Sequence, residues 1–369
     1  MPPTQNRRPV VKRAIVVISI VVFAAAAWSG FRVWSAWQDV DRVSFDTDSA
    51  REALGASEPE SVPEIIDPTA TETTPETEVE ETTTTSLTIP PTYLDRGRLN
   101  TFLVMGLDFS TKRADVILLV MLPANSGDAV IVSIPRDLLV HNPCFKRDTK
   151  INENLWGCPS VGVSGEEQLA VAIEDFTGIP IDHFASFTFE GFEQIIDRLN
   201  GVEICVGDYP VRDPNEDLKE FQMPAGCSMA NGYQALSWMR SRTTQQLAES
   251  GWRIMPGVND LTRNERQQEM LLTALESLKG VRSLPELQGL VQDVSEAFTI
   301  DDELHLGEAI ALLWEVRTID SEDIYRVSLD VRFSFSAVNG AILLLNAPFQ
   351  DSIIAAYPRG FEFFEEWGG

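Results

Sequence analysis

The chain has 369 residues, of which 44% are hydrophobic, so it holds enough apolar material for one large domain or two small ones. Its formal net charge at pH 7 is −27, from 29 Lys and Arg against 56 Asp and Glu. A nucleic-acid-binding protein needs a basic face to neutralise phosphates, so this composition argues against nucleic acid as a partner.

The amino terminus has the pattern of a membrane anchor. A basic tail over residues 1–13 precedes an uncharged apolar run over 14–31, which is just long enough to span a bilayer. Basic residues before the run and acidic ones after it predict a single-pass protein of the cell membrane, with a cytoplasmic amino terminus. A cleaved signal peptide is the alternative, but large aromatic residues directly follow the small ones. A helix buried in a globular domain is opposed by the arginines on both sides.

Residues 32–95 are predicted to be an acidic extracytoplasmic linker. Its most biased part, "TATETTPETEVEETTTTS", consists almost entirely of Thr, Glu and Pro. Such a segment cannot bury enough surface to offset the entropy lost on ordering, and its like charges keep it extended. We interpret it as a disordered spacer that lifts a domain off the membrane.

Four cysteines lie on the predicted exported side. No CxxC pair occurs and the three histidines are scattered, which argues against a zinc site. Four cysteines allow three disulfide connectivities, and free buried thiols are a further alternative. Pairing Cys144 with Cys158 and Cys205 with Cys227 would close two local loops, as is common in an oxidising compartment.

From about residue 96 the pattern alternates between strands and helices. Apolar, branched runs predict strands at 101–107, 116–123, 129–135, 183–189, 202–206, 323–329 and 341–346. Helical spacing predicts helices at 165–178, 190–201, 231–242, about 262–280, 284–297 and 304–317. Interspersed strands and helices predict an α/β fold, with helices flanking a mixed central sheet. The core spans 96–280, and 281–369 completes the same exported domain.

An acidic pair follows the first two strands. Asp108 comes directly after one strand and Asp115 just before the next, with Lys112 and Arg113 between them. Two carboxylates brought together by a tight loop suit a hard cation such as Mg²⁺. The alternative is an ordinary polar loop in which the aspartates only form turns.

The stretch "NDLTRNERQQEM", residues 259–270, predicts the start of a long helix. Thr262 and Glu265 form a capping box sequence just before an apolar run. Arg263 then falls in the first turn, where the positive end of the helix dipole disfavours cations. Arginines at this position make sense if an anion sits at the helix start, held by free N–H groups and guanidinium forks.

Arg263, Arg266 and Gln267 share one face of this helix because they recur at i, i+3 and i+4. An apolar stripe beginning at Met270 is predicted to pack into the core on the opposite face. Upstream, Arg240 and Arg242 share a side only if the chain has left the preceding helix and become extended.

Six arginines could together hold a diphosphate. The alternative is six unrelated surface arginines, each paired with local acids. The six are Arg113, Arg136, Arg240, Arg242, Arg263 and Arg266.

Several of these segments occur in an order and spacing that resemble the LytR-CpsA-Psr family of bacterial cell-envelope phosphotransferases. The segments are "FLVMGLD…KRADVILLV", "VSIPRDLLV", "KINE", "ALSWMRSR" and "DLTRNERQQEML". The resemblance runs from about 97 to 280 and is compatible with the rest of the chain. It implies transfer of a glycopolymer from a polyprenyl-pyrophosphate carrier to peptidoglycan, forming a phosphodiester.

The resemblance also implies roles for individual residues. Asp108 and Asp115 match an acidic pair that helps to hold Mg²⁺ (or Mn²⁺), and Asp260 matches the aspartate of a D-x-x-R motif. Together with Arg266, these form the predicted catalytic set. The predicted pyrophosphate-binding residues are Arg113, Arg136, Arg240, Arg242, Arg263, Arg266, Gln267, Lys150 and Asn152.

The chemistry needs charge neutralised on a pyrophosphate, which arginine clamps and Mg²⁺ supply. Asp260 or Asp115 is expected to accept the proton of the attacking hydroxyl. The lipid tail needs an apolar groove, for which the helix faces near 165–178 and 231–239 are candidates, although ordinary core packing explains them equally well. A polyprenyl-pyrophosphate hydrolase and a non-catalytic lipid-binding envelope regulator are the alternative functions.

Overall fold

The computed structural model describes residues 34–56 (except 36 and 39), 99–108, 113–123, 127–214, 221–256, 298–305 and 319–360, with a few single positions between them. The chain divides into two compact units. The first contains the residues up to Val43 and Ser186–Ile300, and the second contains Ser44–Ala185 and Asp301–Gly369.

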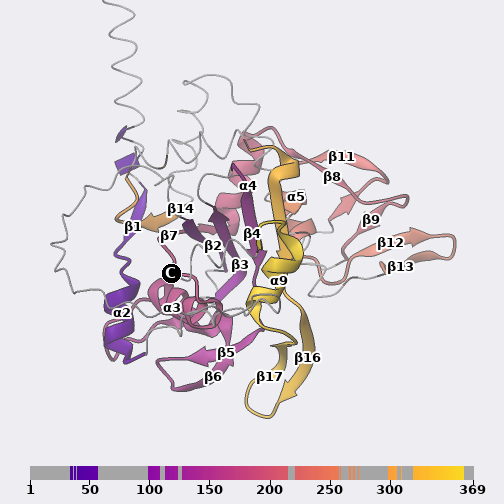
Figure 1. Cartoon of the computed structure of the whole chain (residues 1–369). Helices are drawn as coiled ribbons and strands as arrows, with labels where there is room; N and C mark the ends of the chain where they lie inside the picture. The colour runs from indigo at the N-terminus through magenta and orange to yellow at the C-terminus, as the bar shows by residue number, and fades with distance from the viewer. Residues whose placement is uncertain are drawn as a thin grey trace, which may run out of the picture. The chain divides into compact units, whose positions relative to one another are not determined.

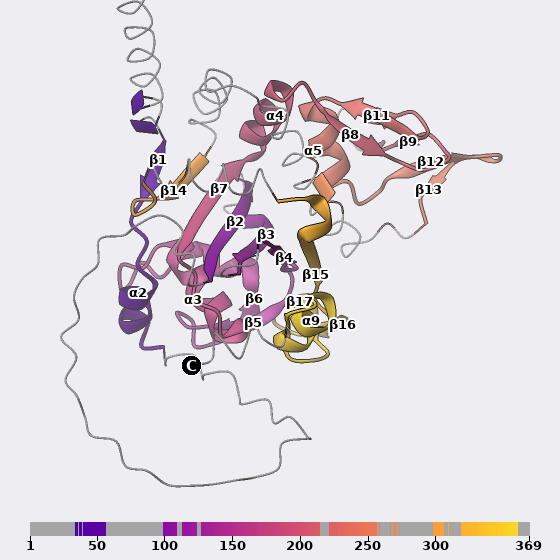
Figure 2. The same ribbon diagram turned by 45° about the horizontal axis from the view of Figure 1, so that its top comes forward.

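The second unit is built on a mixed sheet, as predicted. Its strands follow the order β7-β2-β3-β4-β15, and β2, β3 and β4 lie side by side in Figures 1 and 2. The pairs β2–β3 and β3–β4 are antiparallel, whereas β4–β15 is parallel. Every residue of β4 is buried, which explains why it reads as a continuous apolar run rather than an alternating one. The strand bounds are β2 Asn100–Asp108, β3 Arg113–Leu122, β4 Ala129–Ser133, β7 His183–Thr188 and β15 Ile324–Ser328.

Helix α3 (Gly165–Thr177) confirms the helix predicted at 165–178. Ser164 and Glu167 form a capping box at its start, and Gly178 ends it in the left-handed conformation, where glycine avoids the steric cost of a Cβ. The residues from Leu169 to Ile173 are fully buried, so this face belongs to the core. The remaining elements of the unit are α2 Thr47–Leu54, β5 Leu139–Asn142, β6 Arg147–Lys150, η1 Ile151–Trp156, η4 Ser321–Asp323, β16 Val331–Ser336, β17 Gly340–Leu345 and α9 Phe349–Ala356.

In the described part of the first unit, helices and two small sheets pack around a core of their own. Its buried apolar cluster includes Phe192, Ile196, Val202, Phe221 and Trp238. The predicted helices at 190–201 and 231–242 are confirmed as α4 (Phe189–Arg198) and α5 (Gly232–Arg240), the latter capped by Asn231. One small sheet pairs β8 (Val202–Cys205) with β11 (Cys227–Ala230). The other contains four strands in the order β10-β9-β12-β13. Their bounds, with two further strands, are β9 Val211–Arg212, β10 Gln222–Met223, β12 Gln245–Ala248, β13 Gly251–Ile254, β1 Asp41–Val43 and β14 Phe298–Asp301.

The prediction of a disordered linker over 32–95 is wrong for the first part of this range, because β1 and α2 are folded there. Helix α2 has the signals of a stable short helix, with Asp46 as its amino-terminal cap and Gly55 in the left-handed conformation at its end. Ala50 and Leu54 are buried, and Arg51 pairs with two acids of α3. These contacts with distant residues bury α2, and the local composition of the segment gives no indication of them.

Several predicted segments lie outside the described residues. They are the tail at 1–13, the apolar run at 14–31, the part of the linker at 57–95 and the helix at 284–297. Of the helix predicted at 262–280, Arg266, Glu269, Met270 and Thr273 are described and helical, and Ala309 is helical within 304–317. Across the described segments, no helix is long and apolar enough to cross a membrane.

The structure contains the two disulfides that join near neighbours in the sequence. Cys144 bonds to Cys158, and Cys205 bonds to Cys227 across the β8–β11 pair. Of the three possible connectivities, the local one is therefore confirmed, and the free-thiol alternative is wrong.

Candidate active site

A β-bulge presents Asp115. In the β2–β3 pair Val116 faces Gly106 and Ala114 faces Leu107, so Asp115 is the extra residue that has no partner on β2. A bulge re-aims a side chain and is common beside active sites. Asp108, at the end of β2, pairs with Arg113 in the same hairpin, but its side chain lies outside the described part of the structure.

The strand β4 delivers Arg136 to this carboxylate. Ser133 pairs with Leu118, and the Ile134 N–H donates to the Ile117 carbonyl at 2.9 Å, so the chain leaves β4 beside the start of β3. The Arg136 guanidinium then donates a short hydrogen bond from Nη1 to Asp115 Oδ1. Two of the predicted site residues, 21 positions apart, therefore form an ion pair.

Asp137 joins this pair to Lys150. The Arg136 Nε lies 3.5 Å from Asp137 Oδ2, and Lys150 Nζ donates to Asp137 Oδ1 at 2.8 Å. The β5–β6 hairpin makes the second contact possible, because its register places Leu139 opposite Lys150. We call Asp115, Arg136, Asp137 and Lys150 the Arg136 cluster. It holds two formal positive and two formal negative charges.

Two further predicted residues lie in the same unit. Asn152, in η1, is 4% exposed, its backbone N–H donates to the Arg136 carbonyl at 3.3 Å, and its Oδ1 has no hydrogen-bond partner within the described residues. A buried amide oxygen without a partner is costly, so it is available to a donor from a ligand or water. The exposed Arg113 lies 5.7 Å above the ring of Trp156.

In the first unit, the end of α5 presents two arginines. Arg240 is the last helical residue and stacks over Phe189 at 4.1 Å, while Ser241 is extended and Arg242 is exposed. The helix predicted to reach residue 242 thus ends at Arg240, which meets the condition under which the two arginines can share a side. The helix face at 231–239, considered as a lipid groove, contributes Ala235, Leu236, Trp238 and Met239 to the core.

Arg266 is placed differently from the expectation. It is only 7% exposed, stacks 4.4 Å from the centre of the Trp238 ring, and donates from Nη1 to three oxygens. The expected division of faces between Arg266 and Met270 is wrong, because residues four apart share a helical face and both are buried. Arg263, Gln267 and Asp260 lie outside the described residues.

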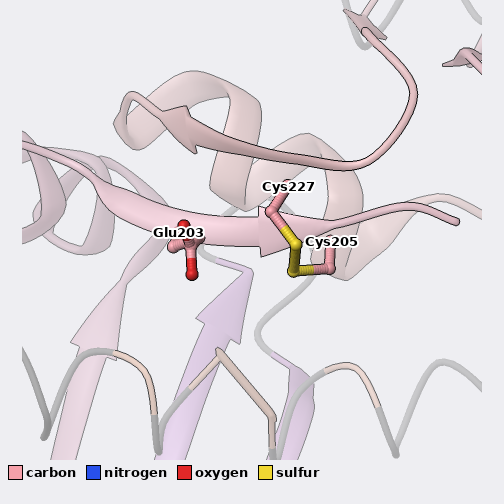
Figure 3. A group of neighbouring side chains, drawn as sticks. All are labelled: Glu203, Cys205 and Cys227. Atoms are coloured by element: carbon pink, nitrogen blue, oxygen red, sulfur yellow. A yellow bond between two sulfur atoms is a disulfide. The ribbon is translucent and has the colours of Figure 1, made fainter.

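A third group of side chains contains residue types that often bind metal ions, but its two cysteines are not available as ligands. Glu203, Cys205 and Cys227 lie close together on β8 and β11, as Figure 3 shows. Both sulfurs belong to the disulfide, so neither supplies the thiolate that a metal would bind. It is the one group of this kind in the part of the chain that is described, and its disulfide cross-links β8 to β11.

The described residues form an α/β fold, and in the second unit a bulged aspartate on a mixed sheet lies beside an arginine and a lysine returned by a hairpin. The LytR_cpsA_psr family model matches residues 66–350, and the chain belongs to that family.

Relatives at modest identity have names that concern the cell wall. The chain is 28% identical over 219 residues to a probable cell wall biosynthesis protein, LcpB, of Corynebacterium glutamicum, covering 58% of this chain and 46% of LcpB. It is 25% identical over 229 residues to the polyisoprenyl-teichoic acid–peptidoglycan teichoic acid transferase TagT of Bacillus subtilis, covering 59% of this chain and 64% of TagT. The chain therefore matches less than two thirds of either relative.

A solved structure described as TagT bound to LIIa-WTA shares the fold. Its TM-score is 0.55 at 22% identity, over 75% of this chain and 94% of the other. At this identity the likeness establishes the arrangement of strands and helices.

Sequence reasoning missed three acceptors: Asp137, which binds Lys150 in the second unit, and Asp213 and Thr244, which bind Ser241 and Arg266 in the first. Asp137 directly follows Arg136, and its proximity to a predicted site residue was the available signal. Asp213 stands in "VRDP" at the end of β9, and Thr244 stands in "RTT" after Arg242. Neither has a local pattern that distinguishes it from a turn residue.

Proposed function

We propose that this protein is a membrane-anchored, extracytoplasmic phosphotransferase that moves a glycopolymer from a polyprenyl-pyrophosphate carrier to peptidoglycan. The observation that carries the proposal is the Arg136 cluster on the bulged edge of β3, in a chain of this family. The name of TagT supports the reaction class, and the name of LcpB supports a role in cell wall biosynthesis. Peptidoglycan, the lipid-linked glycan and membrane lipid are the implied partners.

The cluster suits a pyrophosphate because its cations are held by carboxylates that an anion can replace. Arg136 contacts two aspartates, so a phosphate oxygen competes with carboxylates of the same geometry for one guanidinium fork. Exchange of Arg136 from Asp115 to phosphate would offset part of the donor's negative charge and release the Asp115 carboxylate to bind a cation or to accept a proton. The same side chains then both bind the substrate and release a base.

The reaction is a displacement at phosphorus. A sugar hydroxyl of peptidoglycan attacks the glycan-side phosphorus, and the bond from that phosphorus to the bridging oxygen breaks. Polyprenyl phosphate leaves as an anion, and the hydroxyl proton passes to a carboxylate, Asp115 or Asp260. The arginines stabilise the charge that develops on the phosphoryl oxygens.

The residues fit Mg²⁺ (or Mn²⁺) by the chemistry of their oxygens. Asp115 uses Oδ1 for Arg136, and its Oδ2 has no hydrogen bond within the described residues. Carboxylate oxygens are the ligands that these hard cations prefer, and Asp108 in the same hairpin would provide a second carboxylate. A bound ion would supply further positive charge beside the pyrophosphate.

The decisive experiment is a transfer assay with the full chain in detergent. The protein is incubated with a polyprenyl-pyrophosphate oligosaccharide, un-cross-linked peptidoglycan and Mg²⁺. Glycan joined to peptidoglycan by a phosphodiester is expected, and Arg136→Ala should lower kcat/KM by at least about 100-fold, as removal of a charge-stabilising donor does. Arg147→Ala, an exposed arginine of the same unit, is the matched control.

Other outcomes separate the alternatives. Release of polyprenyl phosphate at the same rate without peptidoglycan would replace the transferase with a hydrolase. Tight binding of the lipid without turnover, in the presence of Mg²⁺ and acceptor, would indicate a non-catalytic regulator.

A further inference from the structure

A buried carboxylate lies behind the two arginines at the end of α5. Asp213, which follows β9, is 1% exposed. It accepts a short hydrogen bond from the Ser241 hydroxyl, and the Thr243 hydroxyl lies 3.0 and 3.2 Å from its two oxygens. A buried carboxylate is costly unless it is hydrogen-bonded, so these contacts strongly favour one conformation of the segment 241–244.

The same segment is held from its other side by Arg266. The Ser241 and Thr244 hydroxyls are hydrogen-bonded to each other, and the Thr244 hydroxyl accepts from Arg266 Nη1 at 3.2 Å. Arg266 Nη1 also donates to the carbonyls of Trp238 and Ser241, at 3.2 and 3.3 Å. A continuous chain of hydrogen bonds thus runs from a buried anion to a buried cation through Ser241 and Thr244. We call it the Asp213–Arg266 network.

The network fixes the backbone on which two arginines stand. Arg240 and Arg242 flank Ser241, whose side chain and carbonyl both take part in the network. Arg240 is further restrained by its stacking over Phe189. Arginines held in advance lose less conformational freedom when they bind an anion, and binding is tighter for that reason.

We propose that Asp213 and Arg266 are positioning residues, which hold the segment 241–244 so that Arg240 and Arg242 can grip a pyrophosphate, and that neither touches the substrate. The proposal rests on the proposed function for the identity of the anion. It reassigns Arg266, which the family resemblance places among the pyrophosphate-binding residues. Its burial and its three backbone and side-chain acceptors suit an internal brace.

Substrate binding gives the first test. Affinity of the full chain in detergent for farnesyl pyrophosphate is measured by calorimetry. Asp213→Asn and Thr244→Val should each weaken binding about tenfold, because each removes a buried hydrogen-bond partner, whereas Thr244→Ser keeps the hydroxyl and should bind as the wild type does. Asp208→Asn, an exposed acid five residues upstream, is the matched control.

A double-mutant cycle separates positioning from direct contact. If Asp213 acts through Arg240 and Arg242, Asp213→Asn should have no further effect on affinity in a background that already carries Arg240→Ala and Arg242→Ala. The same tenfold loss in both backgrounds would overturn the proposal. So would wild-type affinity in both Asp213→Asn and Thr244→Val.

Hydrogen exchange without any ligand tests the network independently of the proposed function. Asp213→Asn should raise the exchange rate of the amides at 240–244 while leaving those of α3 unchanged. Unchanged exchange at 240–244 would overturn the positioning role. If Asp213→Asn exchanges faster at 240–244 but the wild type does not bind farnesyl pyrophosphate, the network still holds this segment in place. The proposed substrate would then be refuted.

Discussion

At the scale of single residues, the Arg136 cluster depends on one guanidinium shared between two carboxylates. Asp115 reaches Arg136 from a bulge, and Asp137 reaches it from the next position in the sequence while also binding Lys150. The two acids therefore have different tasks. Asp115 has a second oxygen, Oδ2, that makes no hydrogen bond to a described residue, whereas Asp137 couples the two cations.

Removing the charge of Asp137 should separate substrate binding from catalysis. In Asp137→Asn the cluster gains net positive charge, so KM for the lipid pyrophosphate should fall. The orientation of Arg136 and Lys150 is lost at the same time, so kcat should fall by roughly tenfold, the pattern expected when ground-state binding improves at the expense of the transition state. Steady-state transfer kinetics check both values.

The control for this variant is Asp148→Asn, an exposed acid whose ion pair is with His141 at 3.6 Å. It should leave kcat and KM unchanged. An Asp137→Asn enzyme with the wild-type kcat would mean that Asp137 does not orient the cations.

At the scale of elements, the pairing of α2 with α3 is the part of the fold that sequence patterns describe least well. Arg51 donates to Glu174 at 2.8 Å and to Asp175, from more than 120 positions away. Burial raises the pKa of the Glu174 carboxyl, and the hydrogen bonds from Arg51 and from the Ile181 N–H lower it without cancelling that rise. Burial lowers the pKa of the Arg51 guanidinium, but its bonds to Asp175 and Glu174 outweigh this and raise it overall.

Loss of Arg51 should destabilise the protein in a pH-dependent way. Arg51→Met removes the cation that pairs with the buried carboxyl of Glu174, which we expect to cost about 3 kcal/mol of unfolding free energy near pH 7. The variant removes an interaction that lowers the pKa of Glu174, so that pKa rises further. A carboxyl whose pKa is raised by folding stabilises the folded state while it is protonated, and this contribution is lost as the pH rises through the folded pKa. The deficit should therefore be smaller near pH 5.

Urea unfolding of wild type and Arg51→Met at pH 5 and pH 7 measures this difference. Arg326→Met, at an exposed arginine of β15, is the control and should show no pH-dependent deficit. A deficit that is equal at the two pH values would mean that Glu174 does not ionise over this range.

The reasons why some elements were predictable and others were not are physical. The strands β2, β3 and β4 and the helix α3 are long enough for their own hydrophobic period to identify them. The strands β9 and β10 have two residues each and β12 reads Gln-Gln-Leu-Ala, so their pairing depends on neighbours rather than on propensity. Asp115, Arg136 and Lys150 were each named as site residues from the sequence, whereas the contacts among them depend on a bulge and a hairpin register.

At the scale of the whole chain, the folded part begins closer to the amino terminus than the sequence analysis predicts. The second unit begins at Ser44, and α2 contributes Ala50 and Leu54 to a buried cluster with Val163 and Val171. The acidic, Thr-rich segment over 57–98 thus lies between two parts of one unit and does not precede it.

A truncated protein tests this boundary. A chain that starts at residue 93 lacks β1 and α2 and leaves Glu174 without Arg51, so its thermal unfolding midpoint should lie at least about 8 °C below that of a chain starting at residue 32. Differential scanning calorimetry compares the two. Equal midpoints would show that α2 adds no stability to the second unit.

The fastening of α2 to α3 also changes what a cut in the chain would do. A protease that cleaves between residues 57 and 98 severs the backbone, yet the piece that carries α2 keeps its buried ion pairs and apolar contacts with the remainder. The two fragments should migrate together under native conditions and separate only in denaturant. We therefore expect the covalent continuity of that segment to be dispensable for keeping α2 associated with the rest of the second unit.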